Sequence, residues 1–200
     1  MNIKDKALNL PSKVLSKFVY MQSDQTLVME FQQATHKEGP FTLLLQRHQQ
    51  KVYYQIKRML HNHMDADDVA QQVWIKVWNK LDGFKMESEF STWLFRIAYN
   101  ETINFIQKQQ RHSGMNETAE NISYESAATG TDHPKSTEIQ IALEQAVLQL
   151  PEKQRFVFML RYFEEYNYEK IASITGTSVG GAKANYHQAI KKMEEILKQH

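Results

Sequence analysis

A polar segment of 25 residues, residues 113–137, divides this chain into two stretches in which apolar residues recur at helical spacing. The segment, SGMNETAENISYESAATGTDHPKST, contains twelve Ser, Thr, Gly and Asn residues, and its four acidic residues and one lysine give a net charge of −3. That composition is typical of a solvated tether. We therefore expect an all-α protein in which two small helical domains are joined by a flexible acidic linker that reaches about 80 to 90 Å when extended.

The expected organisation has an N-terminal tail over 1–23, a first domain over 24–112, the linker over 113–137 and a second domain over 138–200. The absence of cysteine excludes a disulfide scaffold and a thiolate metal site, and suits a reducing compartment. A signal peptide and a membrane span are not expected, because no apolar run approaches about 18 residues. We therefore expect a cytoplasmic protein. The net charge of +1 means that any DNA binding must be local.

Three helices are expected in the first domain. The first is long and runs from Phe41 to Leu60. The second follows Asp65, with two more carboxylates in its first turn where they meet the positive end of the helix dipole. After a break at Asp82 and Gly83, the third helix carries apolar residues at i, i+4, i+7 and i+8: Phe90, Leu94, Ile97 and Ala98.

The second domain contains a candidate helix-turn-helix over residues 168–192, YEKIASITGTSVGGAKANYHQAIKK. Gly176 can adopt the positive φ of a turn that ends a helix, and Ser178 can cap the helix that follows. Ala182, Tyr186 and Ala189 are expected to face the core. Most helical turns that contain glycine do not bind DNA. From this pattern alone, a DNA-binding role and a purely structural role are therefore equally supported.

Three motif blocks taken together resemble bacterial RNA polymerase sigma factors of the extracytoplasmic-function (ECF) type: DADDVAQQVWIKVWNKLDGF, FSTWLFRIAYN and LPEKQRFVFMLRYFEEYNYEKIASITGTSVGGAKANYHQAIKKM. The resemblance covers nearly all of the chain after about residue 24. It implies a non-catalytic subunit whose first domain, sigma region 2, binds core polymerase and the minus-ten promoter element. The second domain, sigma region 4, would bind the minus-thirty-five element. The implied partners are core RNA polymerase, promoter DNA and, as in many members, an anti-sigma factor, and the free protein is expected to be a monomer without a cofactor.

The resemblance gives candidate roles to three sets of residues. Core polymerase would bind residues at the start of the second helix: Asp65, Asp67, Asp68, Gln71 and Gln72. Family members often carry Glu at the position of Gln72. The minus-ten element needs a stacking surface and groups that bond base edges, and its candidates are Lys85, Trp93, Arg96, Asn100 and Asn104. The minus-thirty-five element would lie against the second helix of the helix-turn-helix, and the candidates there are Ser178, Gly180, Lys183, Asn185, His187 and Gln188. Family members often have arginine at the positions of Asn185 and Gln188.

Several alternatives remain open in the sequence. Trp93 could serve the core as well as DNA, and the acidic linker could either mimic a nucleic-acid strand or act as a plain tether. His61 and His63 lack the third and fourth ligands of a metal site, and no catalytic motif is present. Two other classes of protein would use the same fold: a dimeric regulator binding palindromic half-sites about 34 Å apart, and a protein that sequesters a partner without binding DNA.

Overall fold

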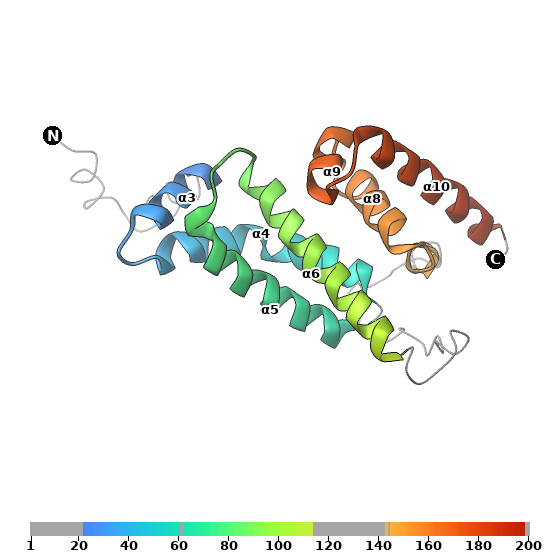
Figure 1. The fold of residues 1–200 in the computed structure, drawn as a ribbon, viewed down its shortest axis with the longest axis horizontal. Coiled ribbons are helices and arrows are strands. Elements are labelled where there is room, and N and C mark those ends of the chain that lie inside the picture. The colour runs from blue at the N-terminus through green and yellow to red at the C-terminus, as the bar shows by residue number, and fades with distance from the viewer. Residues whose placement is uncertain (1–21, 61, 114–142, 144, 199–200) are drawn as a thin grey trace, which may run out of the picture.

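The structure, a computed structural model, describes residues 22–60, 62–113, 143 and 145–198. The expected tail (1–23) and linker (113–137) lie outside these residues except at their edges. The described part contains helices and no strand, which confirms the all-α prediction (Figure 1). Its elements in chain order are α3 (Asp24–Gln33), α4 (Glu38–Met59), α5 (His63–Lys80), the 3-10 turn η1 (Leu81–Gly83), α6 (Phe90–Ser113), α8 (Glu152–Tyr162), α9 (Tyr168–Thr175) and α10 (Val179–Leu197).

The first domain packs α3, α5 and α6 around the long helix α4. Its core includes Phe31, Leu44 and Leu94, none more than 1% exposed, and burying each such side chain stabilises the fold by about 1.5 to 3 kcal/mol. Rings join three helices at one end of this domain. Trp78 of α5 meets Phe31 of α3 and Phe41 of α4 edge to face, at centroid distances of 5.2 and 4.9 Å.

Helix α5 begins at His63, earlier than the sequence pattern predicts. The side chain of Asn62 caps the helix by accepting a hydrogen bond from the backbone N–H of Met64, at 2.9 Å. The expectation that Asp65 would precede the helix is therefore wrong. Asp65 lies in the first turn, where its charge still favours the helix dipole.

The second domain contains the predicted helix-turn-helix. Helix α9 ends at Gly176, which has a φ of 71°, a left-handed conformation that glycine adopts at little cost. Ser178 then caps α10 by accepting a hydrogen bond from the backbone N–H of Gly181, at 3.0 Å. Ala182 and Ala189 are fully buried and Tyr186 is half-buried, as expected. The turn therefore holds α10 against α8 and α9 with one long face left exposed.

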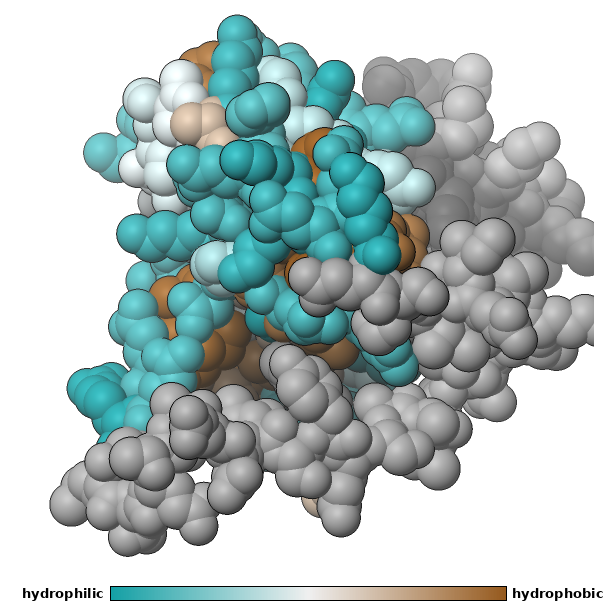
Figure 2. Space-filling model, turned by 90° about the vertical axis from the view of Figure 1, so that its right-hand side faces the viewer, coloured by the Kyte–Doolittle hydropathy of each residue, from teal (hydrophilic) through white to brown (hydrophobic). Residues whose placement is uncertain are grey.

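The two domains lie against each other. Helix α9 packs on α6, and α8 packs on α4, so that the C-terminal helices lie along one side of the first domain (Figure 1). At the end of the molecule where α10 finishes, the surface is mainly hydrophilic, with a few apolar side chains showing between the polar ones (Figure 2).

Candidate polymerase and promoter interfaces

The candidate polymerase-binding residues lie along one helix, α5. Asp67, Asp68, Gln71 and Gln72 are exposed. Asp65 is half-buried and accepts a hydrogen bond from the side chain of Gln109 on α6, at 3.2 Å. Asp67 lies 3.0 Å from Nδ1 of His63, one turn earlier on the same helix. The structure thus leaves Asp68, Gln71 and Gln72 at the surface, whereas Asp65 also ties α5 to α6.

Two apolar side chains on α5 belong to the same surface and were missed in the sequence. Met64 is 74% exposed and Ile75 is 54% exposed, the two highest values among the large apolar residues of the described chain. With a helical repeat of 3.6 residues, positions 64, 68, 71 and 75 fall on one face. Val69, Val73 and Val77 form a buried i, i+4 series, and Ile75 lies outside that series. An apolar residue outside the buried series is the sequence signal that could have identified Ile75 as a surface residue.

Trp93 has both core and surface character. Its ring stacks on Phe84 at a centroid distance of 4.8 Å and an interplanar angle of 29°, yet the residue is only half-buried. Phe84 lies at the end of η1, where the chain turns towards α6, and Lys85 is exposed directly after it. The structure therefore brings Trp93 and Lys85 to the same end of the first domain, with Trp93 partly anchored and partly accessible.

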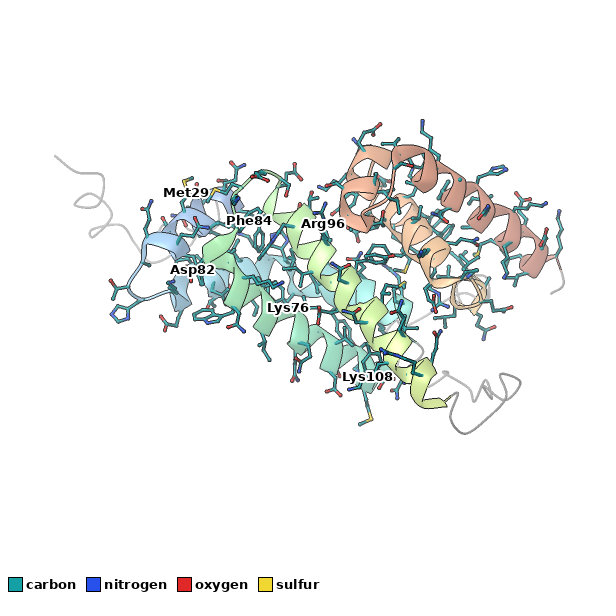
Figure 3. All side chains as sticks on the ribbon, in the orientation of Figure 1. Met29, Lys76, Asp82, Phe84, Arg96 and Lys108 are labelled. Carbon is teal, nitrogen blue, oxygen red and sulfur yellow. The ribbon has the colours of Figure 1, made fainter. Side chains whose placement is uncertain are left out.

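An exposed polar stripe follows Trp93 along α6. Arg96, Asn100 and Asn104 are four residues apart and all exposed, so they lie one above the other on the helix surface. Lys108 continues this stripe by one more turn, and Figure 3 shows it towards the opposite end of α6 from Arg96. Lys108 was not among the DNA-binding candidates expected from the sequence. The α6 stripe thus combines amides that can bond base edges with cations at both ends.

Arg96 contacts the second domain. Its Nε donates to the backbone carbonyl of Ser173 on α9 at 2.9 Å, and its Nη2 donates to the same oxygen. A second contact lies nearby, where Nζ of Lys170 on α9 is 2.6 Å from the carboxylate of Glu89. The hydrogen bond from Lys170 and the attraction of its charge hold the pKa of Glu89 below its usual value. The second turn of α6 and the residue that precedes the helix are therefore joined to α9.

The third set of candidates lies on and just before α10. Lys183, His187 and Gln188 are exposed, whereas Asn185 is half-buried at the edge of that face. Gln188 accepts a hydrogen bond from the side chain of Gln154 on α8, at 2.9 Å. Ser178 and Gly180 lie at the start of the helix, and the hydroxyl of Ser178 is used as its cap. Among these candidates, Lys183 and His187 are therefore the side chains on α10 that remain most accessible to DNA.

The described residues include no group of three or more His, Cys, Asp or Glu side chains that could hold a metal ion. His61 lies outside those residues. His63 pairs with Asp67 and shares a hydrogen bond of 2.8 Å with the hydroxyl of Tyr53, so its surroundings are a local polar cluster. Within 22–60, 62–113 and 145–198, no helix is long and apolar enough to cross a bilayer.

Comparison with known proteins finds a separate family match for each of the two domains. Residues 44–112 match the pattern of Sigma-70 region 2, and residues 140–193 match that of Sigma-70 region 4. The chain is 32% identical over 184 residues to the RNA polymerase sigma-H factor of Pseudomonas aeruginosa, a match that covers 88% of this chain and 94% of that protein. It is 33% identical over 175 residues to the ECF RNA polymerase sigma-E factor of Escherichia coli K12, covering 84% and 90%.

Solved structures show the same fold. The sigma factor RpoE of Bartonella quintana, solved with the anti-sigma factor NepR, matches with a TM-score of 0.67 and 26% identity over 79% of this chain and 96% of that chain. CnrH, solved with the cytosolic domain of CnrY, matches with a TM-score of 0.66 and 20% identity over 89% and 99%.

The two regions, their order and their helical fold define a specificity subunit of RNA polymerase, a class that recognises promoters and performs no catalysis itself. Within that class, the chain belongs to the ECF family of RNA polymerase sigma factors. It acts in promoter recognition and transcription initiation, as the resemblance predicted.

Proposed function

We propose that three separate faces divide the work of this sigma factor. The face of α5 binds core polymerase, the α6 stripe with Trp93 and Lys85 binds the minus-ten element, and α10 binds the minus-thirty-five element. In this assignment region 2 comprises 24–112 and region 4 comprises 138–200, with 113–137 as the linker and 1–23 as a tail. The observation that carries the proposal is that each candidate set lies on, or just before, its own helix and keeps most of its polar groups exposed.

Binding of the minus-ten element would use both stacking and hydrogen bonds. Base stacking on an aromatic side chain contributes about 1 to 3 kcal/mol per base, which offsets part of the cost of removing a base from the duplex. Trp93 is supported from behind by Phe84, so its ring is held in place before DNA arrives. Asn100 and Asn104 offer amides to base edges, while Lys85 and Arg96 attract phosphates.

Binding of the minus-thirty-five element would place α10 in the major groove. Lys183 and His187 are exposed on the side away from the buried Ala182 and Ala189. Gly180 lies in the first turn, where backbone N–H groups can approach a phosphate. Because the α10 face carries few cations, the salt-dependent part of binding is small. We therefore expect the protein to bind DNA weakly without polymerase.

Core polymerase would bind α5 through acidic and amide groups together with apolar contact. Asp68, Gln71 and Gln72 supply acceptors and donors for a basic partner, and Met64 and Ile75 supply apolar area on the same helix. In a protein interface a few apolar anchors that become buried contribute most of the affinity, and Met64 and Ile75 are the candidates for this role on α5.

The likeness to the Bartonella quintana protein, solved with NepR, supports an anti-sigma factor as a further partner. We infer that the protein acts in the cytoplasm, where RNA polymerase transcribes the chromosome, and that it is a monomer when free. A dimeric regulator on a palindrome would instead give two equivalent half-sites.

The proposal can be tested by cleavage from defined positions, because the chain has no natural cysteine. Three single-cysteine variants, Gln107→Cys, Ala184→Cys and Asn79→Cys, each carry an iron chelate on an exposed position of α6, α10 or α5. In the promoter complex with core polymerase, we expect position 107 to cleave DNA near the minus-ten element and position 184 near the minus-thirty-five element. Position 79 should cleave polymerase protein and leave DNA intact. Cleavage of a single DNA element by both 107 and 184 would refute the division of work.

A further inference from the structure

One side chain outside both family matches bonds the backbone at the end of α5 and η1. Gln32 lies near the C-terminal end of α3, before the residues that match region 2. Its Nε2 donates to the backbone carbonyls of Leu81 and Phe84, each at 2.9 Å, and lies 3.3 Å from the carbonyl of Asp82. The side chain therefore reaches across η1 from a helix that lies 49 to 52 positions earlier in the sequence.

The chemistry of these contacts fixes the orientation of the Gln32 amide. All three neighbours are carbonyl oxygens, which only accept hydrogen bonds, so the NH2 group and not the amide oxygen must face them. Two N–H groups cannot point straight at three oxygens, and the 3.3 Å contact is accordingly the weakest of the three. The last carbonyls of a helix lack partners within it. Gln32 supplies donors to these carbonyls, and thus acts as a cap that comes from a different helix.

An ion pair holds the same turn from the start of the next helix. Nζ of Lys37, which directly precedes α4, lies 2.6 and 2.7 Å from the two carboxylate oxygens of Asp82. The Asp82 side chain is 54% exposed, and an ion pair at such a position contributes little. Figure 3 places Asp82 and Phe84 at the end of the first domain where Met29 of α3 lies. Gln32 is therefore the main polar tie between α3 and this turn.

The segment after the turn is held by a second point. Met86 has a φ of 58°, a left-handed conformation that is strained for a residue other than glycine. Its side chain packs against the core, and such strain persists only where the surrounding structure fixes the backbone. Between Gln32 and Met86, Phe84 supports the ring of Trp93 and Lys85 is exposed. The backbone that carries these two side chains is therefore fixed on both sides.

We propose that Gln32 is a positioning residue for promoter opening. By fixing the carbonyl of Phe84, it holds the Phe84 ring behind Trp93 and sets the direction of Lys85. The stacking surface is then formed before an unpaired base reaches it, and a preformed surface binds more tightly because it does not have to be ordered on binding. This inference rests on the proposed assignment of Trp93 and Lys85 to the minus-ten element. Gln32 acts through these residues and does not itself contact DNA.

Substitutions at position 32 separate this role from a purely structural one. Gln32→Met keeps the length of the side chain and removes its N–H donors, whereas Gln32→Lys restores N–H donors at a similar reach. Gln33→Met is the matched control, because Gln33 is the next residue of α3 and is exposed. Each full-length variant is assembled with core polymerase. Three quantities are measured: affinity for core polymerase, closed-complex binding and permanganate-reactive open complex.

We expect Gln32→Met to reduce the open complex about fivefold, because it removes the hydrogen bonds that fix the turn. Affinity for core polymerase and closed-complex binding should change by less than about twofold. Gln32→Lys and Gln33→Met should both keep the open complex within about twofold of wild type. Because Gln32 acts through Trp93, Gln32→Met should reduce the open complex by less than about a further twofold in a Trp93→Ala background.

A purely structural role would give a different pattern. It would lower core affinity, closed complex and open complex together, and the effects of Gln32→Met and Trp93→Ala would multiply; either result overturns the inference. An unchanged open complex in Gln32→Met, while Trp93→Ala reduces it, overturns the inference and leaves the proposed function standing. If Trp93→Ala leaves the open complex unchanged, the proposed minus-ten face fails, and the inference fails with it.

Discussion

Replacing Ile75 by asparagine should weaken binding to core polymerase without disturbing the fold. The side chain is 54% exposed, so about half of its apolar surface remains to be buried by a partner. Complete burial of an isoleucine side chain contributes about 1.5 to 3 kcal/mol, and half of that is roughly 0.8 to 1.5 kcal/mol. A loss of this size corresponds to a dissociation constant about four- to twelvefold higher.

The affinity can be measured by titrating fluorescently labelled protein with core polymerase. Leu197→Asn is the matched control, because Leu197 is 40% exposed but lies at the end of α10. Both substitutions should shift the thermal midpoint by no more than about 2 °C, as expected for exposed positions. A change of less than twofold for Ile75→Asn, or an equal loss for Leu197→Asn, would refute the assignment of the α5 face.

Three further predictions concern single side chains. Trp93→Ala should leave closed-complex binding largely intact while reducing permanganate-reactive open complex at least about fivefold, with Trp93→Phe retaining more; equal loss of both steps would count against a role in melting. Lys183→Ala should weaken transcription only where the upstream element is present, and an equal effect on a promoter without it would show that the assignment is wrong. Asp24→Asn should lower the free energy of unfolding at pH 7 by about 1 kcal/mol, because His48 lies 2.7 Å from the Asp24 carboxylate and this hydrogen bond is the main cause that lowers its pKa. Because folding lowers the pKa of Asp24, its carboxylate stabilises the fold at pH values above the ordinary pKa of 3.8, and this stabilisation is lost as the pH falls below that value. The difference between wild type and variant in the free energy of unfolding, measured with urea, should therefore shrink at low pH; a constant difference would contradict this.

Much of each domain could be predicted from local pattern. The long helix α4, the buried stripe of α6 and the turn at Gly176 and Ser178 each have a local physical cause that is visible in the sequence. The start of α5 was harder to predict, because Asn62 and Asp65 are both residue types that favour the beginning of a helix and only the structure shows which one caps it.

The contact between domains could not be predicted in the same way. Tyr99 and Phe156 fit the apolar stripes of their own helices, and a stripe indicates that a residue is buried without indicating against what. Nothing in the sequence sets Arg155 apart, yet it is buried, and Arg96, selected from the sequence as a DNA contact, bonds a carbonyl 77 residues away. Such long-range partners depend on tertiary packing, which has no local signature.

Run-off transcription with core polymerase, with and without the protein, on fragments of the source genome is the most direct test of its role as a sigma factor. We expect discrete new transcripts that require the protein and start downstream of two unlike promoter elements. No transcripts, together with a protein that shifts DNA by itself as a dimer on a palindrome, would contradict it.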